Sequence, residues 1–418
     1  MNTARYPALS LAERDRRWAL ARSLMREEGL DCLILFGSKG REQLDRYLTN
    51  DRSGGIVIFP LEGELVHLAW AVFDLASHLE SSLRGEASWV SDMRVGASGP
   101  GIVGVLREKG CENAAIGVIG TQAGGPGEFE GWAPYATWKY VLDALPKARF
   151  REVTVPFLKR IWPKSAEELA LVRRAAEIGE EASQEMLRLC KPGASEAEVY
   201  AGVMNILYRN GASGSTSPYI SPLILHSGPD NPSWGAPMWL FRPQPPRILK
   251  EGDLVLAEIF PRYGGLEVQI QMCVAIPPVH PVNRELAGVA RRAYEAGLQM
   301  LRPGNTFGEV VKAMGAPLAE AGAWQLTPLI HSLNPLFWIG LTGVGISALP
   351  GIDRYKGVAP EVPALRDADM TLKEGMVFAF EPNACQGKHR VNIGGTVIVT
   401  AQGAEELNRL PTFMCERG

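Results

Sequence analysis

The sequence predicts an α/β protein with two domains, the second of which is built from an internal repeat related by a pseudo-twofold axis. A chain of 418 residues is longer than one ordinary hydrophobic core, so two domains are expected. In the first part of the chain, a segment with helical periodicity is followed by short apolar segments of strand length. The remainder contains two similar series of segments. We therefore assign residues 1–160 to the first domain and 161–418 to the second.

Composition and charge indicate a globular protein. Apolar residues make up 46% of the chain and charged residues 21%, and no apolar run approaches the roughly 18 residues that a membrane helix needs. The N-terminal segment lacks the apolar region of a signal peptide, so we expect a cytoplasmic protein with no membrane contact. A net charge of -3 without an evident basic face argues against a nucleic-acid partner. The six scattered cysteines argue against a disulfide framework and a zinc finger.

The first domain has the pattern of a mixed α/β unit. An amphipathic helix is expected at 9–30, and DCLILF (31–36) follows as a strand typical of burial on both faces. Segments 54–59 and 64–70 flank a turn-like Pro-Leu-Glu-Gly and predict a hairpin, and 114–120 predicts another strand. The glycine-rich segment that follows lacks the ending of a phosphate loop and the GxGxxG spacing, so we interpret it as a plain loop.

The second domain begins at a capping box, in which Ser165 and Glu168 mark the start of a long helix. The same landmarks then occur twice in the same order: Arg-Arg-Ala, Pro-Gly, Glu-Val, Gly-Ala and the tetrapeptide LKEG. Each half, at about 165–276 and 284–400, is predicted to run helix, Pro-Gly break, helix, connection, LKEG, strand, hairpin, strand. Neither half can bury its sheet alone, so the halves should pair about a pseudo-twofold axis with the helices outside.

Each copy of LKEG leads into an apolar strand with a glutamate six residues after the glycine, Glu258 in the first half and Glu381 in the second. Along its strand Glu258 shares a face with Leu254 and Leu256. A buried carboxylate is costly unless it is paired, hydrogen-bonded or bound to a metal. One such glutamate could be a structural acceptor for backbone amides. Two at equivalent positions favour a functional cleft where the halves meet.

The whole chain resembles the creatinase/aminopeptidase P/prolidase family, which is peptidase M24-like and has the pita-bread fold. The motifs that carry the resemblance stand in the family's order: KSAEELALVRRAAEI, HSGPDN, KEGDLVLAEIFPRYGG, LKEGMVFAFEP and VIVTAQGAEELNRLP. The resemblance implies a creatinase-like N-terminal α/β domain, a C-terminal pita-bread catalytic domain, and a homodimer in which the N-terminal domain contacts the partner.

In metal-dependent members of that family, two Asp, one His and two Glu hold two bridged metal ions that activate a water. The first Asp position resembles Glu258, and the second falls on Gln269. The fourth ligand is intact as Glu381, and the last Glu falls on Gly394. A bridged pair needs two carboxylates that each span both metals, and both bridging positions have lost them. We therefore expect no bound metal and no cofactor.

The family's histidine lies in a His-Gly-like turn, and two alignments are open for it. The nearest candidate is His331 in PLIHSLN, whereas a gap-shifted alignment places Thr342 there. With His331, a single ion on Glu258, His331 and Glu381 is an alternative, since glutamate and histidine suit zinc or manganese.

Creatinase, within the same resemblance, works without a metal on a small guanidino substrate, using a histidine and glutamates. Glu381 matches one of those glutamates, whereas the other position resembles Gln271. The catalytic histidine is expected shortly after HSGPDN, where this chain has Pro-Ser-Trp-Gly at 232–235. The chain thus resembles the fold of creatinase without its complete machinery, and creatinase activity itself is not implied.

The residues of the expected cleft suit acid–base chemistry. Glu258 and Glu381, close together in a dry cleft, would repel and share one proton, which makes one an acid and the other a base. His331, if it turns inward, is the natural general base near neutral pH; a surface or core-satisfied histidine is the alternative. Gln269 and Gln271 share a strand face and offer donors and acceptors for an amide, urea or carboxylate group of a ligand.

Three further residues are candidates for binding a substrate. His226, just before Ser-Gly in HSGPDN, is a second candidate histidine. Arg390 could reach a substrate carboxylate from the rim, although a hairpin tip of this kind is more often simply solvated. Trp234 lies in a proline-rich loop where core packing is difficult, which favours a lid over an apolar or aromatic substrate.

Three functions follow from these residues. The leading one is a metal-independent, creatinase-like hydrolase or lyase that acts on a C–N or similarly activated bond of a small molecule. The alternatives are a metallohydrolase of the Xaa-Pro aminopeptidase/prolidase type with a degenerate mononuclear site, and a non-catalytic ligand-binding pita-bread protein. Two buried acids give a binding protein no advantage without a cationic ligand, which argues against the last.

Overall fold

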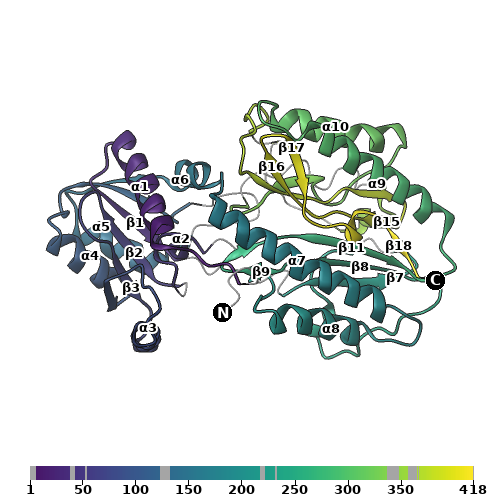
Figure 1. The fold of residues 1–418 in the computed structure, drawn as a ribbon, viewed down its shortest axis with the longest axis horizontal. Helices are drawn as coiled ribbons and strands as arrows, with labels where there is room; N and C mark the ends of the chain where they lie inside the picture. Colours follow the sequence, from purple (N-terminus) through teal and green to yellow (C-terminus); the bar gives the residue numbers. More distant parts are fainter. Residues whose placement is uncertain are drawn as a thin grey trace. The chain divides into compact units, whose positions relative to one another are not determined.

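The computed structural model describes residues 6–37, 43–51, 54–122, 132–216, 222–230, 233–336, 348–355, 365 and 367–417. These residues form two compact units (Figure 1). The N-terminal unit is built from Ala8–Trp162 and the C-terminal unit mainly from the chain that follows. Within the described ranges, none of the helices combines the length and apolar character required to span a bilayer.

The N-terminal unit contains a six-stranded sheet with strand order β4-β3-β2-β1-β5-β6. β1 runs antiparallel to β2 and parallel to β5, and β2 and β3 form the predicted antiparallel hairpin. The elements of this unit are α1 Leu11–Glu28, β1 Cys32–Phe36, α2 Leu44–Thr49, β2 Ile56–Pro60, β3 Val66–Ala69, α3 Val72–Leu83, β4 Asp92–Val95, α4 Gly99–Glu108, β5 Ala115–Ile119, α5 Tyr135–Ala144, β6 Arg149–Glu152 and α6 Thr154–Ile161.

Local chemistry accounts for the ends of the first helix and for the burial of the first strand. α1 begins two residues later than predicted because the Ser10 side chain accepts the Glu13 N–H as an N-cap. It ends at Gly29, whose φ of 63° is left-handed. All five residues of β1 are buried, as an apolar central strand should be. The glycine-rich segment predicted to be a loop lies largely at 123–131, outside the described residues.

The C-terminal unit repeats one order of elements twice. The first series is α7 Ala166–Leu189, α8 Glu196–Arg209, β7 Ile224–Gly228, β8 Leu254–Ile259, β9 Arg262–Tyr263, β10 Leu266–Glu267 and β11 Ile270–Ala275. The second is α9 Pro281–Met300, α10 Phe307–Glu320, β12 Ile330–Ser332, β13 Val377–Phe380, β14 Asn383–Gln386, β15 His389–Asn392 and β16 Thr396–Thr400, followed by β17 Gly403–Glu406 and β18 Cys415–Glu416. Short 3₁₀ turns lie at Met238–Leu240, Ile352–Arg354 and Leu410–Thr412.

Each half contributes three equivalent strands to a four-stranded sheet. The first sheet has the order β18-β11-β8-β7 and the second β12-β13-β16-β17, so β7, β8 and β11 correspond to β12, β13 and β16. The hairpins β9–β10 and β14–β15 occupy equivalent places in the two series. In Figure 1 the helices α9 and α10 lie at one edge of this unit and α8 at the opposite edge, with strands between them. The internal repeat that the sequence predicts is therefore present in the fold.

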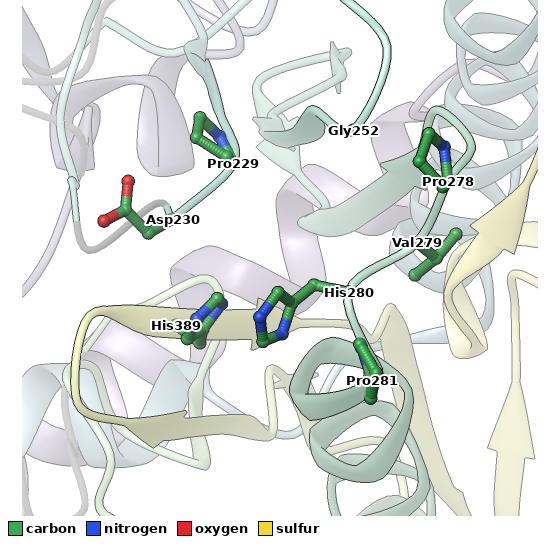
Figure 2. Close-up of a pocket in the computed structure, with 8 residues that line it drawn as sticks. All are labelled: Pro229, Asp230, Gly252, Pro278, Val279, His280, Pro281 and His389. Carbon is green, nitrogen blue, oxygen red and sulfur yellow. The ribbon is translucent and has the colours of Figure 1, made fainter.

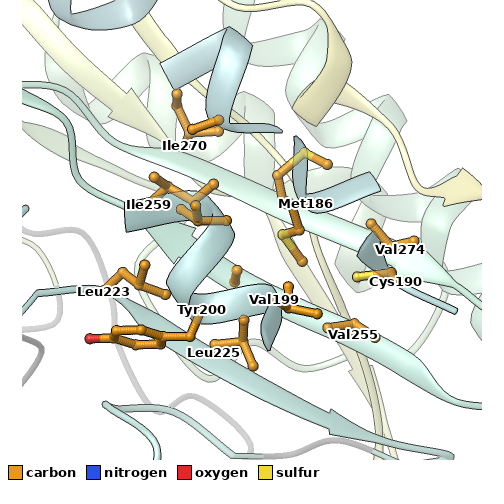
Figure 3. Close-up of a cluster of buried hydrophobic side chains, with 14 of the residues drawn as sticks. Met186, Cys190, Val199, Tyr200, Leu223, Leu225, Val255, Ile259, Ile270 and Val274 are labelled. Atoms are coloured by element: carbon orange, nitrogen blue, oxygen red, sulfur yellow. The ribbon is translucent and has the colours of Figure 1, made fainter. Parts of the chain in front are cut away.

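The first sheet is covered by α7 and α8 (Figure 3). Met186 of α7 and Val199 of α8 lie in one buried cluster with Val255 of β8 and Ile270 of β11. Full burial of each such side chain contributes roughly 1.5–3 kcal/mol. The sheet and its two helices are thus held together as one layered core, and Glu258 and Gln271 lie on the opposite face of the sheet.

The two LKEG segments are turns that need glycine. Gly252 has a φ of 80° and Gly375 a φ of 83°, both in the left-handed region that other residues rarely adopt. Each glycine turns the chain into the apolar strand that carries a buried glutamate. The left-handed conformation explains why both copies of the tetrapeptide end in glycine.

Candidate active site

Six buried polar side chains gather where the two halves of the C-terminal unit meet. They come from β8, the start of β11, β12, the end of β13 and the end of β15, and none is more than 4% exposed. They are Glu258, Gln269, Gln271, His331, Glu381 and Asn392. Gln271 lies directly opposite Glu258 in the antiparallel pair β8–β11, so these two side chains share a face.

Backbone contacts between the halves bring these residues together. The Gln271 N–H donates to the Gly394 carbonyl at 3.0 Å, which forms an isolated antiparallel bridge between the two residues. The Gln269 N–H donates to the Thr396 hydroxyl, also at 3.0 Å. Gln271 and Gly394 each stand thirteen positions after the glutamate of their own half, Glu258 and Glu381. An antiparallel bridge between equivalent positions is the contact expected on a twofold axis.

A hydrogen-bonded network surrounds Glu381. The Gln271 amide Nε2 donates to Glu381 Oε2 at 3.3 Å and lies 3.5 Å from Gln269 Oε1. His331 Nε2 lies 2.9 Å from Gln269 Oε1 and 3.3 Å from Glu381 Oε1. His331 Nδ1 lies 2.9 Å from the carbonyl oxygen of Ser332.

The chemistry of these groups constrains their hydrogen-bonding roles. A carboxylate only accepts hydrogen bonds, so Gln271 presents its NH₂ group to Glu381 and to Gln269 Oε1. His331 Nε2 therefore faces two oxygen acceptors, and Nδ1 faces a carbonyl oxygen. A ring that carries a proton on both nitrogens would satisfy these acceptors and pair with the Glu381 carboxylate.

Glu258 has a different set of partners. Its Oε1 accepts hydrogen bonds from Trp234 Nε1 and from Asn392 Nδ2, each at 3.1 Å. The guanidinium Nη2 of Arg390 lies 3.7 Å from the same oxygen. The sequence predicts that the two glutamates share one proton. In the structure the two carboxylates have separate partners, Arg390 beside Glu258 and His331 beside Glu381.

The loop that carries Trp234 is held from both sides. Arg390 Nη1 donates to the Ser233 carbonyl at 2.6 Å, and His226 Nε2 lies 2.6 Å from the Gly235 carbonyl. Burial lowers the pKa of His226, while its bond to the Gly235 carbonyl acts in the opposite direction. Trp234 itself is 47% exposed, so it lies between Glu258 and solvent. Three residues predicted to contact substrate thus form one assembly over Glu258.

The positions that resemble the metal ligands of the related enzymes do not fit a bridged pair of ions. Gln269 supplies a neutral amide, and its oxygen already faces His331. Gly394 cannot be replaced by a ligand without moving the backbone, because its φ is 139° and a Cβ there would lie 1.9 Å from the Phe380 carbonyl oxygen. Among the described residues, no three His, Cys, Asp or Glu side chains form a group suited to a metal ion. Thr342, the alternative for the family's histidine, lies outside those residues.

A separate hollow of about 490 Å³ lies at the other end of β15 (Figure 2). His389 lines it beside His280, with the two rings stacked at 4.3 Å between centroids, and Asp230 stands on the opposite wall. None of the six buried polar residues lines this hollow.

Asn392 is a site residue that is not among those predicted from the sequence. An asparagine near a hairpin is usually a turn residue, so its type alone does not indicate a site. The internal repeat carries a signal for it: Val268-Gln269-Ile270 and Val391-Asn392-Ile393 match, each eleven positions from glutamate to amide. Asn392 is therefore the counterpart of Gln269 in the second half.

Comparison with known proteins relates the chain to one family. The profile of the metallopeptidase family M24 matches residues 170–401, more than half of the chain. Agropine synthesis cyclase of Rhizobium rhizogenes is 28% identical over 289 residues, which are 65% of each protein. The probable dipeptidase PepE of Mycobacterium tuberculosis is 26% identical over 252 residues, 59% of each. Ectoine hydrolase of Halomonas elongata is 25% identical over 285 residues, 66% of this chain and 65% of that protein. The match thus spans less than two thirds of each relative.

Solved structures share the fold over nearly the whole chain. Dipeptidase PepE of Mycobacterium ulcerans has a TM-score of 0.72 at 21% identity, with 98% of this chain and 99% of that chain covered. The X-Pro aminopeptidase of Thermotoga maritima has a TM-score of 0.72 at 17% identity, with 96% and 99% covered. These likenesses confirm the predicted fold class, an N-terminal α/β domain followed by a pita-bread domain.

Proposed function

The chain belongs to metallopeptidase family M24, and from this membership we propose that it is a hydrolase that cleaves a C–N bond of a small molecule by acid–base catalysis without a metal ion. Relatives with hydrolase names support the reaction class. The absence of a metal ion from the proposed reaction is supported by the side chains that this chain places at the site.

The network around Glu381 carries the proposal. It places the amides of Gln269 and Gln271 and the ring of His331 around a single carboxylate. A metal ion binds lone pairs, whereas the NH₂ group of Gln271 presents protons, as does His331 when both of its ring nitrogens are protonated. A site lined in this way suits proton transfer.

The geometry supports distinct roles for three residues. Glu258, whose Oε1 accepts two N–H bonds, is an ionised carboxylate suited to take a proton from a water molecule. The water oxygen would then bond to the substrate carbon as the C–N bond breaks. His331 would deliver its Nε2 proton to the departing nitrogen, and Glu381 would stabilise the imidazolium beforehand. The sequence suggested His331 as a base, and its doubly donating geometry favours the acid role instead.

A metal-dependent dipeptidase is the second candidate, because dipeptidases are among the relatives and solved structures. It would need a ligand set that the described residues do not supply. The two candidates differ in the number of metal ions bound per chain, which can be measured directly.

We predict that the purified protein holds less than one equivalent of tightly bound transition metal per chain, because Gln269 and Gly394 stand where bridging carboxylates are needed. Elemental analysis after dialysis measures this. Hydrolysis of small amides, ureas or amidines should be insensitive to a chelator, and added manganese or cobalt should not induce cleavage of Xaa-Pro dipeptides. One or two tightly bound ions per chain, or metal-stimulated dipeptide cleavage, would favour the second candidate instead.

A further inference from the structure

Two buried oxygen atoms at the site lack hydrogen-bond donors. Gln271 Oε1 and Asn392 Oδ1 have no partner in the described part of the chain, although Gln271 is fully buried and Asn392 is 2% exposed. Buried amide oxygens are normally satisfied, because an unpaired one loses its hydrogen bonds to water without replacement. Two such oxygens at one site require an explanation.

The identity of both atoms is determined by the carboxylates beside them. The nitrogen of Gln271 donates to Glu381 Oε2, and that of Asn392 donates to Glu258 Oε1. A carboxylate accepts but does not donate, so neither amide can be turned around. The unpaired atoms are therefore oxygens, and each can only be satisfied by a donor.

Both acceptors lie next to Glu258. Gln271 is its cross-strand partner, and Asn392 is hydrogen-bonded to it. Neighbouring side chains on one face of an antiparallel pair are about 4.5–5.5 Å apart at Cβ. Both amide residues are consequently neighbours of the carboxylate to which we assign the role of base.

The groups beside the two oxygens favour a neutral ligand. The unpaired acceptors are the uncharged oxygens of two amides, so a carboxylate ligand would place further acceptors against them. The Arg390 guanidinium lies 3.7 Å from Glu258 Oε1, the oxygen to which Asn392 donates. A cationic ligand at these acceptors would therefore lie near a fixed positive charge.

We propose that the substrate presents two N–H donors of a neutral, amide-like group, as in a cyclic urea or a primary amide, to Gln271 Oε1 and Asn392 Oδ1. This inference rests on the proposed function in that it places the substrate of the proposed hydrolase at this site. The sequence suggests an amide, a urea or a carboxylate as the ligand group, and this inference excludes the carboxylate.

A series of five-membered rings of nearly equal size tests the proposal. Imidazolidin-2-one offers two N–H groups, pyrrolidin-2-one one and cyclopentanone none, while 2-iminoimidazolidine is the cationic counterpart. Titration by saturation-transfer NMR should show the affinity falling by about tenfold for each N–H removed. The cation should bind more weakly than imidazolidin-2-one. Equal binding of imidazolidin-2-one and cyclopentanone, no saturable binding of the former, or preference for the cation would each overturn the proposal.

Variants locate the binding to the two oxygens. Gln271→Met and Asn392→Leu each remove one acceptor at nearly constant volume, and each should abolish one tenfold step of the series. Gln386→Met makes the same change at an exposed position of β14 and should retain the full series. If either site variant fails to fold, the wild-type series alone decides. Binding requires no turnover, so an N–H-dependent series in a protein that hydrolyses nothing would sustain this inference while refuting the proposed function.

Discussion

Two glutamates at equivalent positions of the repeat have different surroundings. Glu258 accepts N–H groups from Trp234 and Asn392, whereas Glu381 faces His331 and Gln271. The sequence predicts the presence of both carboxylates, because each follows an LKEG turn at the same distance. It does not predict their partners, since Asn392 is 134 positions from Glu258 and Gln271 is 110 positions from Glu381. Such contacts depend on how the halves pair.

Replacing either glutamate by glutamine should reduce turnover strongly. We expect Glu258→Gln and Glu381→Gln to lower kcat by about 10²–10⁴, roughly 3–5 kcal/mol, because the base or the partner of the imidazolium is lost. The free energy of unfolding should fall as well, by about 1–3 kcal/mol, since Arg390 or His331 loses a charged partner.

The LKEG turns provide matched controls for this experiment. Glu251→Gln and Glu374→Gln make the same chemical change at exposed positions shortly before each strand, and both variants should keep wild-type turnover and stability. Wild-type turnover in Glu258→Gln and Glu381→Gln would refute the catalytic interpretation.

A buried histidine of the N-terminal unit should make stability depend on pH. His67 is 1% exposed, and neither ring nitrogen has a hydrogen-bond partner among the described residues. Burial lowers the pKa of His67, and the nearby carboxylates of Asp45, Asp51 and Asp74 oppose this effect. A base whose pKa is lower in the folded state binds fewer protons there than in the unfolded chain.

The contribution of His67 is therefore fully present above the unfolded pKa of about 6.5 and is lost as the pH falls below it. Urea midpoints measured at about pH 7.5 and pH 5 should differ more for the wild-type protein than for His67→Leu. An identical difference in both proteins would show that His67 does not titrate on unfolding.

At the scale of helices and strands, the sequence predicts most of what is observed. The capping box of Ser165 and Glu168 forms with both of its bonds, and Ser195 with Glu198 begins α8 in the same way. Such signals involve residues close together in the chain, so they can be recognised in a single sequence.

The close packing of α7 against the sheet depends on residues far apart in the chain, so the sequence does not predict it. At Gly179 an added Cβ would lie 2.1 Å from Ile270 Cδ1 and 2.9 Å from Pro261 Cγ.

Gly179 therefore allows α7 to approach β11, and Gly179→Ala should destabilise the protein by about 1–3 kcal/mol despite the higher helix propensity of alanine. Gly315 in α10 is the matched control, because a Cβ there meets no atom within 4 Å. Gly315→Ala should stabilise by about 0.5–1 kcal/mol. Denaturant unfolding of both variants measures the difference, and a stabilising Gly179→Ala would contradict this packing.

At the scale of the whole molecule, the sequence predicts a homodimer that forms through the N-terminal unit. That unit carries five large apolar side chains along α3 and just before it that are 59–80% exposed: Trp70, Val72, Phe73, Leu79 and Leu83. α3 contains no buried residue among those described. Exposed apolar patches of this kind mark association surfaces, and a stable interface buries about 800 Å² per partner.

We expect light scattering at micromolar concentration to give twice the 45.5 kDa chain mass. Phe73→Asp should shift the protein toward the monomer, because it places a charge in the apolar surface of α3. Glu80→Asp, a conservative change on the same helix, should leave the dimer intact. A monomeric wild-type protein would contradict the prediction.

The bridge between Gln271 and Gly394 joins equivalent positions that make different contributions to the site. Gln271 brings an amide to the Glu381 carboxylate, whereas Gly394 brings only its backbone carbonyl to the bridge. In the present backbone a side chain at Gly394 would collide with the Phe380 carbonyl oxygen. Exchanging the two residues would therefore remove the amide beside Glu381 and create a clash on the other side of the axis, so the two halves of the repeat are not interchangeable at this point.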